Sequence, residues 1–182
     1  MDQITSSLAP PRPTMATKSP VAGQGNEGAG SVTKRLGSEL MSLMMSASPG
    51  ISAFPKNDGN LFDWVGTIEG PSGTYYNGLT FKISIHFPAN YPYVPPVIRF
   101  ESPCFHPNVD INTGAICLDI LQDKWSAVYS VQTILLSLQS LLGEPNNASP
   151  LNTDASNIWD SAEVFKTQLM RYYRPVADEG SA

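Results

Sequence analysis

Residues 102–120 read SPCFHPNVDINTGAICLDI and open a longer stretch, residues 102–129, that shows neither helical nor strand periodicity. The segment contains Cys104 and Cys117, the two cysteines of the chain, and His106, one of its two histidines. A loop of this length inside a compact domain is usually functional. We therefore look here for chemistry, and in the flanking segments for the fold.

Alternating apolar and polar residues upstream of this stretch predict three strands. Residues 81–87, FKISIHF, alternate strictly, which is typical of a strand with one buried and one wet face. Residues 62–68 alternate less regularly and end at the turn residues 70–73, GPSG. Residues 97–100, VIRF, follow a proline-dense connection at residues 91–96. Three strands with short links predict an antiparallel meander.

Apolar residues at helical spacing predict helices before and after the strands. The first runs from an N-cap at Ser31 to about Ser48, the second from an N-cap at Ser130 to a C-cap at Gly143, and the last over residues 154–174 with a break near residue 160. The inward residues we expect are Val32, Leu36, Leu40, Leu43 and Met44, then Val131, Ile134, Leu135, Leu138, Leu141 and Leu142, then Ala162, Phe165, Leu169 and Tyr172. The fold class is therefore α+β.

The ends of the chain differ in composition from its middle. Residues 1–30 are rich in proline, glycine, serine and threonine and carry few apolar side chains, so burial cannot offset their ordering entropy. We expect a disordered N-terminal extension at residues 1–30, a folded core at residues 31–175 and a flexible tail at residues 176–182.

Composition narrows the class of partner. A net charge of −5 and a pI of about 4.9 argue against a protein that binds nucleic acid through its overall field. No apolar run is long enough to span a bilayer, and the N-terminus lacks the apolar stretch of a secretory signal. We expect a soluble intracellular monomer without nucleic-acid or membrane partners.

Zinc binding and disulfide formation are two structural uses that residues 102–120 allow. Zinc takes thiolate and imidazole ligands, but Cys104, His106 and Cys117 lack the paired spacing of a zinc finger, and His86 stands well upstream. A bridge between the two cysteines requires an oxidising compartment. We therefore expect no metal site, and a disulfide only in such a compartment.

Three chemical interpretations of Cys117 remain open from the residues alone. It can pair with His106 as a nucleophile and base, as in cysteine hydrolases. It can carry an acyl group as a thioester, with the Asn108 amide as a donor to the oxyanion. It can also be a small buried apolar residue.

Several motifs together resemble the ubiquitin-conjugating enzymes. His106-Pro107-Asn108, then ICLDI at residues 116–120 and Trp125-Ser126, are similar to the family's active-site segment. Residues 91–96, YPYVPP, resemble its proline-rich loop, and residues 141–151, LLGEPNNASPL, resemble its segment after the central helix. The resemblance covers residues 31–175. It implies an N-terminal helix, an antiparallel meander, a long active-site stretch, a central helix and C-terminal helices.

The resemblance also implies roles for individual residues. Cys117 would form a thioester with the C-terminus of ubiquitin, which an activating enzyme supplies at the expense of ATP. Asn108 would stabilise the oxyanion during attack by a substrate lysine, or order the active-site loop. His106 and Pro107 would shape that loop. The chain itself would need no nucleotide, metal or other cofactor.

The nearest likeness within the family is to the cell-cycle branch that works with the anaphase-promoting complex. It rests on KRL at residues 34–36, PGISAFP at residues 49–55, residues 143–152 and the N-terminal extension. It implies a RING-type ligase as partner, protein substrates, and a location in the cytoplasm and nucleus. The residues that would face the ligase are Lys34, Arg35, Tyr93, Ser126 and Ala127.

Three departures bear on that comparison. The connection from Asn108 to Cys117 is one residue longer than the family's usual spacing, and we expect a turn within residues 110–114, with Asn112 and Gly114 in unusual backbone conformations, to absorb it. Ser149 stands where many relatives carry an acid, which leaves Asp119 or an acid of the partner to assist the lysine. Ser130 and Gln132 replace the Asp and Arg expected in the cell-cycle branch.

Two further functions fit the same fold. One is a non-catalytic module that binds ubiquitin, which the presence of Cys117 disfavours. The other is a carrier of a different ubiquitin-like modifier, which charging by each modifier's activating enzyme would separate.

Overall fold

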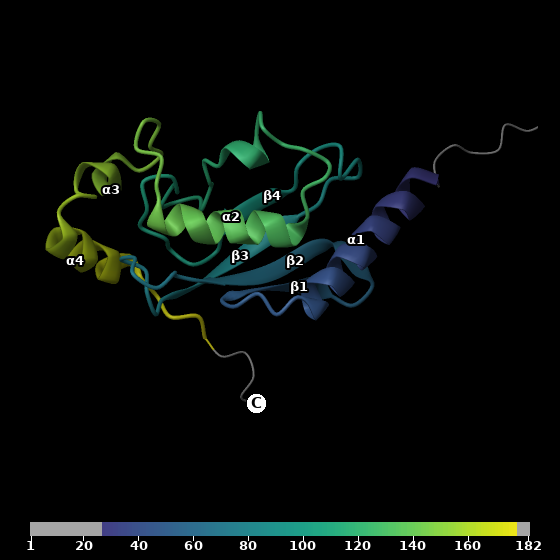
Figure 1. The fold of residues 1–182 in the computed structure, drawn as a ribbon, viewed down its shortest axis with the longest axis horizontal. Coiled ribbons are helices and arrows are strands. Elements are labelled where there is room, and N and C mark those ends of the chain that lie inside the picture. Colours follow the sequence, from purple (N-terminus) through teal and green to yellow (C-terminus); the bar gives the residue numbers. More distant parts are fainter. Residues whose placement is uncertain (1–26, 178–182) are drawn as a thin grey trace, which may run out of the picture.

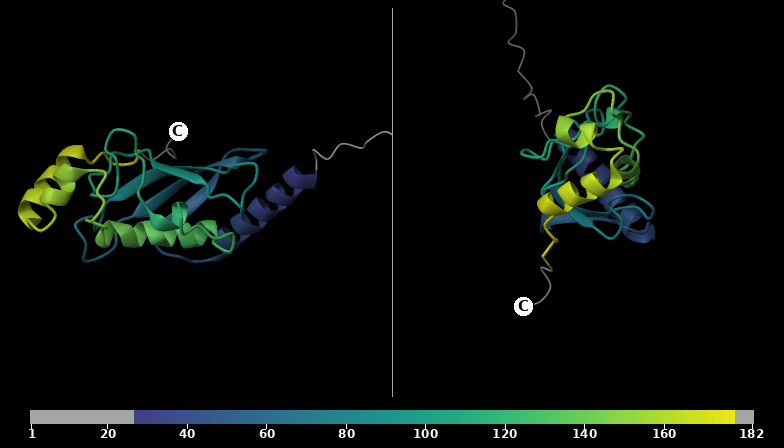
Figure 2. Two further views of the ribbon diagram at one scale, coloured as in Figure 1. Left: turned by 90° about the horizontal axis from the view of Figure 1, so that it is seen from above. Right: turned by 90° about the vertical axis from the view of Figure 1, so that its left-hand side faces the viewer.

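Four antiparallel strands form one sheet in the computed structural model, which describes residues 27–177 (Figure 1). The strands are β1 (Ile51–Asn57), β2 (Asn60–Glu69), β3 (Thr80–His86) and β4 (Val97–Phe100). Helix α2 (Val131–Gly143) lies along the sheet, with α1 (Glu27–Met45) at one end and α3 (Thr153–Asn157) and α4 (Ala162–Tyr172) at the other, as Figure 2 shows from above. The α+β class is as predicted.

The strands follow one another in the order β1-β2-β3-β4, so the predicted meander is confirmed. The expectation of three strands missed β1, which forms an edge of the sheet. Proline cannot donate to a β ladder and is confined to edges and bulges, and the register of β1 shifts between Pro55 and Asn57. The tight turn at Asp58-Gly59, where Gly59 has a φ of +85°, is the hairpin signal that identifies β1.

One face of the sheet is buried and the other is wet. In β3, Phe81, Ile83 and Ile85 are at most 1% exposed, whereas His86 is exposed, as the alternation predicted. Apolar side chains of the other strands and of α2 join the same core. The core therefore lies between the sheet and α2, which sets the position of that helix.

Helix α1 begins at Glu27, so the predicted N-cap at Ser31 is wrong and residues 27–30 belong to the helix. The glycines at positions 28 and 30 suggested an unstructured segment, but helix propensity alone is a weak guide to where a helix begins. The remainder of the predicted extension, residues 1–26, and residues 178–182 of the predicted tail lie outside the described residues. Among residues 27–177, no helix is long and apolar enough to cross a membrane.

The inward face of α1 differs from the predicted stripe at its C-terminal end. Val32, Leu36 and Leu43 are buried as expected, but Met44 is 74% exposed. Glu39 is only 7% exposed. Steps of four, three and four residues connect these buried positions on one helical face, and Met44 lies outside that series. A buried acid therefore takes a place that the pattern assigned to an apolar residue.

Helix α2 is the element that the sequence predicted most completely. Its N-cap is Ser130, whose Oγ accepts from the backbone N–H of Thr133. The buried residues of α2 are Val131, Ile134, Leu135, Leu138, Leu141 and Leu142, which is the full predicted set. Gly143 is the last helical residue rather than the C-cap, and the N–H of Glu144 closes the helix on the carbonyl of Ser140 at 3.0 Å.

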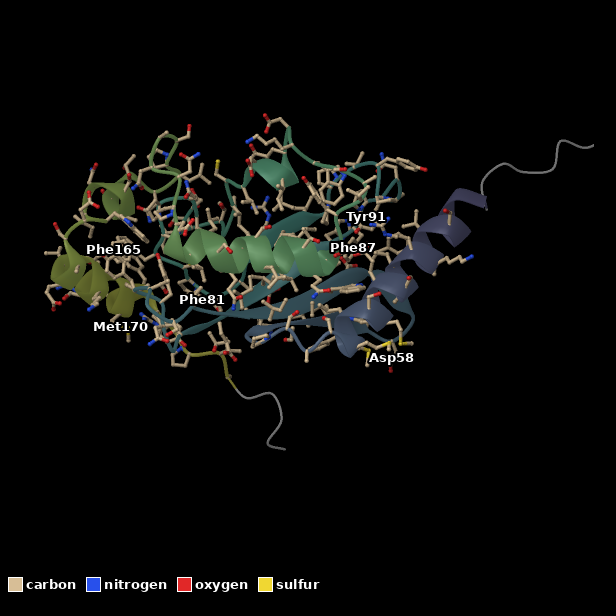
Figure 3. The ribbon with its side chains drawn as sticks, in the orientation of Figure 1. Asp58, Phe81, Phe87, Tyr91, Phe165 and Met170 are labelled. Atoms are coloured by element: carbon tan, nitrogen blue, oxygen red, sulfur yellow. The ribbon has the colours of Figure 1, made fainter. Side chains whose placement is uncertain are left out.

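The two C-terminal helices are separated at the predicted break. Phe165 and Leu169 bury one face of α4, and Figure 3 shows Phe165 among the side chains between α4 and α3. Tyr172 was predicted to point inward, but it is 42% exposed because it lies at the rim, where its ring stacks on Phe105 with centroids 5.3 Å apart. Helix α4 thus supports the start of the irregular stretch.

Candidate active site

The stretch that joins β4 to α2 has two parts of opposite character. Residues 104–109, here called the buried arm, are all buried. Residues 110–124, the outer arm, are exposed or half-buried except for Gly114, and they include the short 3₁₀ helix Asp119–Leu121. Antiparallel pairing of Val109 with Ile116 joins the two arms.

His106 holds the buried arm against the C-terminal end of α2. Its Nε2 lies 2.7 Å from the carbonyl oxygen of Leu141, and its Nδ1 lies 3.0 Å from the backbone nitrogen of Asn108. A carbonyl only accepts and a backbone N–H only donates, so the ring is neutral with its proton on Nε2. Burial lowers the pKa of His106 to about 4. Since both ring nitrogens are occupied, His106 is not placed to act as a base for Cys117.

Asn108 and Pro107 bind the loop that follows α2. The Nδ2 of Asn108 donates to the carbonyl oxygen of Asn146 at 2.7 Å, and its Oδ1 accepts from the N–H of Asn146 at 2.8 Å. The carbonyl oxygen of Pro107 accepts from the backbone nitrogens of Leu151 and Asn152 at 2.9 and 3.0 Å. Four hydrogen bonds therefore fix residues 146–152 beside the buried arm.

A turn takes up the long connection between Asn108 and Cys117. The Oδ1 of Asp110 accepts from the N–H of Thr113 at 2.7 Å, and the hydrogen bonds from Thr113 lower the pKa of Asp110. Gly114 has a φ of +67°, in the left-handed region that favours glycine. The N–H of Cys117 donates to the carbonyl oxygen of Asn108 at 2.9 Å, so the two residues remain backbone neighbours.

The two cysteines differ in their access to solvent. Both are free thiols, but Cys104 is only 1% exposed, whereas Cys117 is half-buried at the surface. Burial raises the pKa of the Cys104 thiol. A nucleophilic cysteine must reach its partner as a thiolate, so Cys117 is the thiol placed to react. Within the described part of the chain, no group of three or more His, Cys, Asp or Glu residues is arranged to hold a metal ion.

A shallow groove of about 460 Å³ begins at Leu118, the residue after Cys117, and follows α2. Leu118 forms its near end, and the residues of the α2 side are Thr133, Leu136, Ser137, Ser140, Leu141 and Glu144. Open grooves of mixed polarity suit an extended polypeptide better than a compact small molecule, which prefers an enclosed apolar pocket. The segment that contains Cys117 thus borders, through Leu118, a surface that fits a protein partner.

Comparison with known proteins agrees with this geometry. The sequence profile described as ubiquitin-conjugating enzyme matches residues 35–173. The chain is 69% identical over 147 residues to ubiquitin-conjugating enzyme E2-20 kDa of Schizosaccharomyces pombe, which covers 80% of this chain and 83% of that relative. It is 44% identical over 145 residues to ubiquitin-conjugating enzyme E2 3 of Arabidopsis thaliana, with 80% and 91% covered. The chain belongs to the ubiquitin-conjugating enzyme family.

Solved structures show that this ubiquitin-conjugating enzyme also has the family's fold. It is similar to the H. polymorpha ubiquitin-conjugating enzyme Pex4p, solved with the soluble domain of Pex22p, with a TM-score of 0.74, 32% identity, and 80% of this chain and 100% of that chain covered. It matches a structure described as a novel ubiquitin-conjugating enzyme with a TM-score of 0.74 and 34% identity over 81% and 99% of the two chains. The predicted family and fold are confirmed, and the chain is an enzyme, since the family consists of thioester-forming transferases.

Asp119 of this ubiquitin-conjugating enzyme is already paired. Its Oδ2 lies 2.7 Å from the Nζ of Lys124, and this hydrogen bond lowers the pKa of Asp119. A carboxylate with a lowered pKa is a weaker proton acceptor near neutral pH. Ser149 is exposed in the loop that the buried arm fixes, and its hydroxyl offers no carboxylate there.

The five positions predicted to face the ligase differ in accessibility. Lys34 is exposed, Tyr93 is 83% exposed, and Ser126 and Ala127 are half-buried. Arg35 instead binds within the enzyme: its Nε lies 2.6 Å from Oε1 of Glu39, and its Nη2 donates to the carbonyl oxygen of Tyr129 at 2.9 Å. Arg35 is half-buried, as Ser126 and Ala127 are, and it also ties α1 to the end of the loop that contains those two residues.

Two features of the site carried no recognisable sequence signal, and a third did. Asn146 binds Asn108 through backbone atoms, which every residue other than proline has, so its type reveals nothing. Glu39 lies at the helical spacing of the buried residues of α1, but its charged side chain did not indicate burial. Val128 is 82% exposed, and its position directly after Ser126-Ala127 places it in the loop that the sequence predicts to face the ligase.

Proposed function

We propose that Cys117 accepts ubiquitin as a thioester from its activating enzyme. The observation that carries this proposal is that Cys117 is the accessible thiol of the described residues and that its N–H donates to the carbonyl oxygen of Asn108. In the loading step, the Cys117 sulfur bonds to the carbonyl carbon of the C-terminal residue of ubiquitin. The bond from that carbon to the sulfur of the activating enzyme breaks, and the Cys117 proton passes to the released thiolate.

Transfer to a substrate then forms an amide. The ε-amine of a lysine attacks the thioester carbon, the bond to Cys117 breaks, and Cys117 leaves as a thiolate while a base takes the lysine proton. The Nδ2 of Asn108 has two hydrogens and gives one to Asn146. In this proposal the second stabilises the oxyanion of the tetrahedral intermediate.

The proton of the lysine needs an acceptor other than Ser149. Asp119 is close to Cys117 in sequence, but Lys124 holds its carboxylate and lowers its pKa. We assign Asp119 the attraction of the incoming lysine, with the proton going to an acid of the partner. In this proposal lysine transfer therefore depends on an acid of the partner, as loading depends on the activating enzyme.

A charging assay with ubiquitin, its activating enzyme and ATP tests the carrier mechanism. On non-reducing gels, wild type should form a band that a thiol reductant removes, and Cys117→Ser should form none or a reductant-resistant ester. Cys104→Ala is the matched control, because it removes the other thiol without placing a hydroxyl in the core. Charging by the activating enzyme of another modifier, or no charging of folded wild type, would favour the other carrier or the non-catalytic module.

We propose the anaphase-promoting complex as the ligase, with action in the cytoplasm and nucleus. The support is the likeness of residues 34–36, 49–55 and 143–152 to the cell-cycle branch, together with the exposed Tyr93 and Val128 on neighbouring loops. Ser130 and Gln132, which replace the charged pair expected in that branch, both form hydrogen bonds. Ser130 caps α2, and the side chain of Gln132 donates to Ser48 at 2.8 Å.

Stimulation of lysine transfer by the purified complex tests this pairing. Tyr93→Ala should raise the half-saturating concentration of the charged enzyme without changing its charging. Equal stimulation of wild type and Tyr93→Ala would contradict this docking surface, and no stimulation of wild type would contradict the choice of ligase. Imaging of a fluorescent fusion would check the location.

A further inference from the structure

Glu39 of α1 is a buried acid that three donors share. Its Oε1 accepts from the Nε of Arg35 at 2.6 Å and from the hydroxyl of Tyr91 at 2.5 Å. Its Oε2 accepts from the N–H of Val131, the first residue of α2, at 2.6 Å. Burial and the hydrogen bond to Glu39 raise the pKa of Tyr91, which keeps its hydroxyl protonated and donating.

These donors come from the elements that form the ligase-facing surface. Tyr91 begins the loop that exposes Tyr93, and Arg35 also donates to Tyr129, at the end of the loop that exposes Val128. The Nε1 of Trp125 donates to the carbonyl of Pro92 at 2.8 Å and so ties the two loops together. Figure 3 shows Tyr91 between α1 and the N-terminal end of α2.

Helix α2 connects this cluster with the reactive thiol. At its N-terminus the Glu39 carboxylate binds the Val131 N–H, where the helix dipole favours a negative charge. At its C-terminus the carbonyl of Leu141 accepts from His106, the residue that also binds the Asn108 backbone. One side of α2 also lines the groove that starts at Leu118, next to Cys117.

We propose that Glu39 is a positioning residue for ligase-stimulated transfer, because its carboxylate fixes α2 against the two ligase-facing loops. The inference rests on the proposed function and deepens it. When a ligase binds Tyr93 and Val128, this link keeps the two loops and α2 together, so the groove that begins at Leu118 keeps its shape. Without this carboxylate, the loops and α2 shift separately.

Glu39→Gln isolates the carboxylate, because the amide has nearly the same shape. A carboxylate accepts at both oxygens, whereas the amide presents an N–H on one side. That N–H must face either the Val131 N–H or the donors from Arg35 and Tyr91, so one link is lost. Tyr91→Phe removes a single donor and should act in the same direction with a smaller effect.

The experiment measures lysine transfer by charged enzyme as a function of the concentration of charged enzyme, with the anaphase-promoting complex as the stimulating probe. Glu39→Gln should lower kcat on the order of tenfold, because a misplacement of about 1 Å can cost about 100-fold, and should leave KM nearly unchanged. Tyr93→Ala should instead raise KM, since it removes uniform binding. Charging by the activating enzyme and the thermal unfolding curve report whether each variant is folded.

Ser130→Ala is the matched control, because it weakens the N-cap of α2 through Thr133 without touching α1 or the loops. A kcat loss in Ser130→Ala equal to that in Glu39→Gln would reduce the effect to helix fraying and overturn the inference. An unchanged kcat in Glu39→Gln would also overturn it. If Glu39→Gln does not fold, an unchanged kcat in Tyr91→Phe would overturn the inference instead. Failure of wild type to charge on Cys117 would instead refute the proposed function, so the two failures are distinct.

Discussion

The buried arm and the outer arm differ in what their polar atoms bind. In the buried arm, the side chains of His106 and Asn108 and the carbonyl of Pro107 bind other parts of the enzyme, mostly Leu141 and residues 146–152. In the outer arm, the polar side chains bind one another at the surface, as Asp119 binds Lys124. Cys117 belongs to the outer arm, but its N–H binds the buried arm.

This difference separates positioning from chemistry. Removing a buried hydrogen-bonding group leaves its partner unsatisfied and costs about 1–3 kcal/mol of stability, whereas exposed ion pairs contribute little. Variants of the buried arm should therefore lower stability as well as activity, and variants of the exposed side chains of the outer arm should alter activity alone. Four substitutions test how far this separation holds.

Asn108→Ala should have the largest effect on activity, since Asn108 is the residue of the buried arm to which we assign a part in the chemistry. Loss of one oxyanion donor typically lowers kcat by about 100- to 1,000-fold, so lysine transfer should fall by that order while charging of Cys117 persists. The measurement is single-turnover discharge of charged enzyme to lysine.

Asn146→Ala is the control for that experiment, because Asn146 binds Asn108 through backbone atoms that the substitution retains. It should discharge at nearly the wild-type rate. An equal loss in both variants would mean that Asn108 acts only by fixing the loop after α2.

His106 should make stability depend on pH. Burial lowers its pKa to about 4, whereas an unfolded histidine has a pKa of about 6.5. Between these values the unfolded chain binds the proton and the folded enzyme does not. Stability should therefore fall as the pH drops from about 6.5 toward 4, by on the order of 3 kcal/mol in total.

Urea unfolding at several pH values measures this dependence. His106→Gln removes the titrating ring, and its stability should be lower at neutral pH but vary less over the same interval. His86→Gln is the control, because His86 is exposed on the wet face of the sheet. A slope that persists in His106→Gln and disappears in His86→Gln would contradict the assignment.

Gly114→Ala tests whether the turn of the outer arm is independent of the core. A Cβ at Gly114 would overlap the carbonyl oxygen of Phe100, whereas a Cβ at Gly59 would meet nothing within 4 Å. Both glycines have positive φ, so both alanines are strained by about 1–2 kcal/mol. Gly114→Ala should cost a further 1–3 kcal/mol, as overpacking does, in urea unfolding. Equal losses at the two sites would show that the turn can move away from β4.

The sequence was sufficient for elements whose periodicity reflects burial. Helix α2 and strand β3 each bury one regular face, so their apolar residues could be read in advance. Strand β1 was missed because Pro55 at a sheet edge removes the usual signal. Met44 was assigned to the core because apolar character was taken for burial, although α1 turns it to solvent.

The site residues were predicted from residue types and motifs rather than from periodicity. His106, Asn108 and Cys117 were found in this way. Their partners were not, because Leu141 and Asn146 take part through backbone atoms. Glu39 escaped notice since an acid at helical spacing normally marks a solvated face. Long-range pairing decides such positions, and a single sequence does not show which backbone atoms meet.

Lys124→Met should have the smallest effect and sharpen the contrast between the arms. It removes the hydrogen bond that lowers the pKa of Asp119, so this pKa should rise toward its ordinary value, which NMR titration of the carboxylate can follow. The pair is exposed, so the midpoint of urea unfolding should hardly move.

Lysine transfer should change within about threefold, because an exposed ion pair contributes so little. If Asp119 attracts the incoming lysine, transfer should rise in Lys124→Met, since the competing ammonium is gone, and fall in Asp119→Asn. A fall in both variants would show that the ion pair itself orders the outer arm, and the division between positioning and chemistry would then fail at this point.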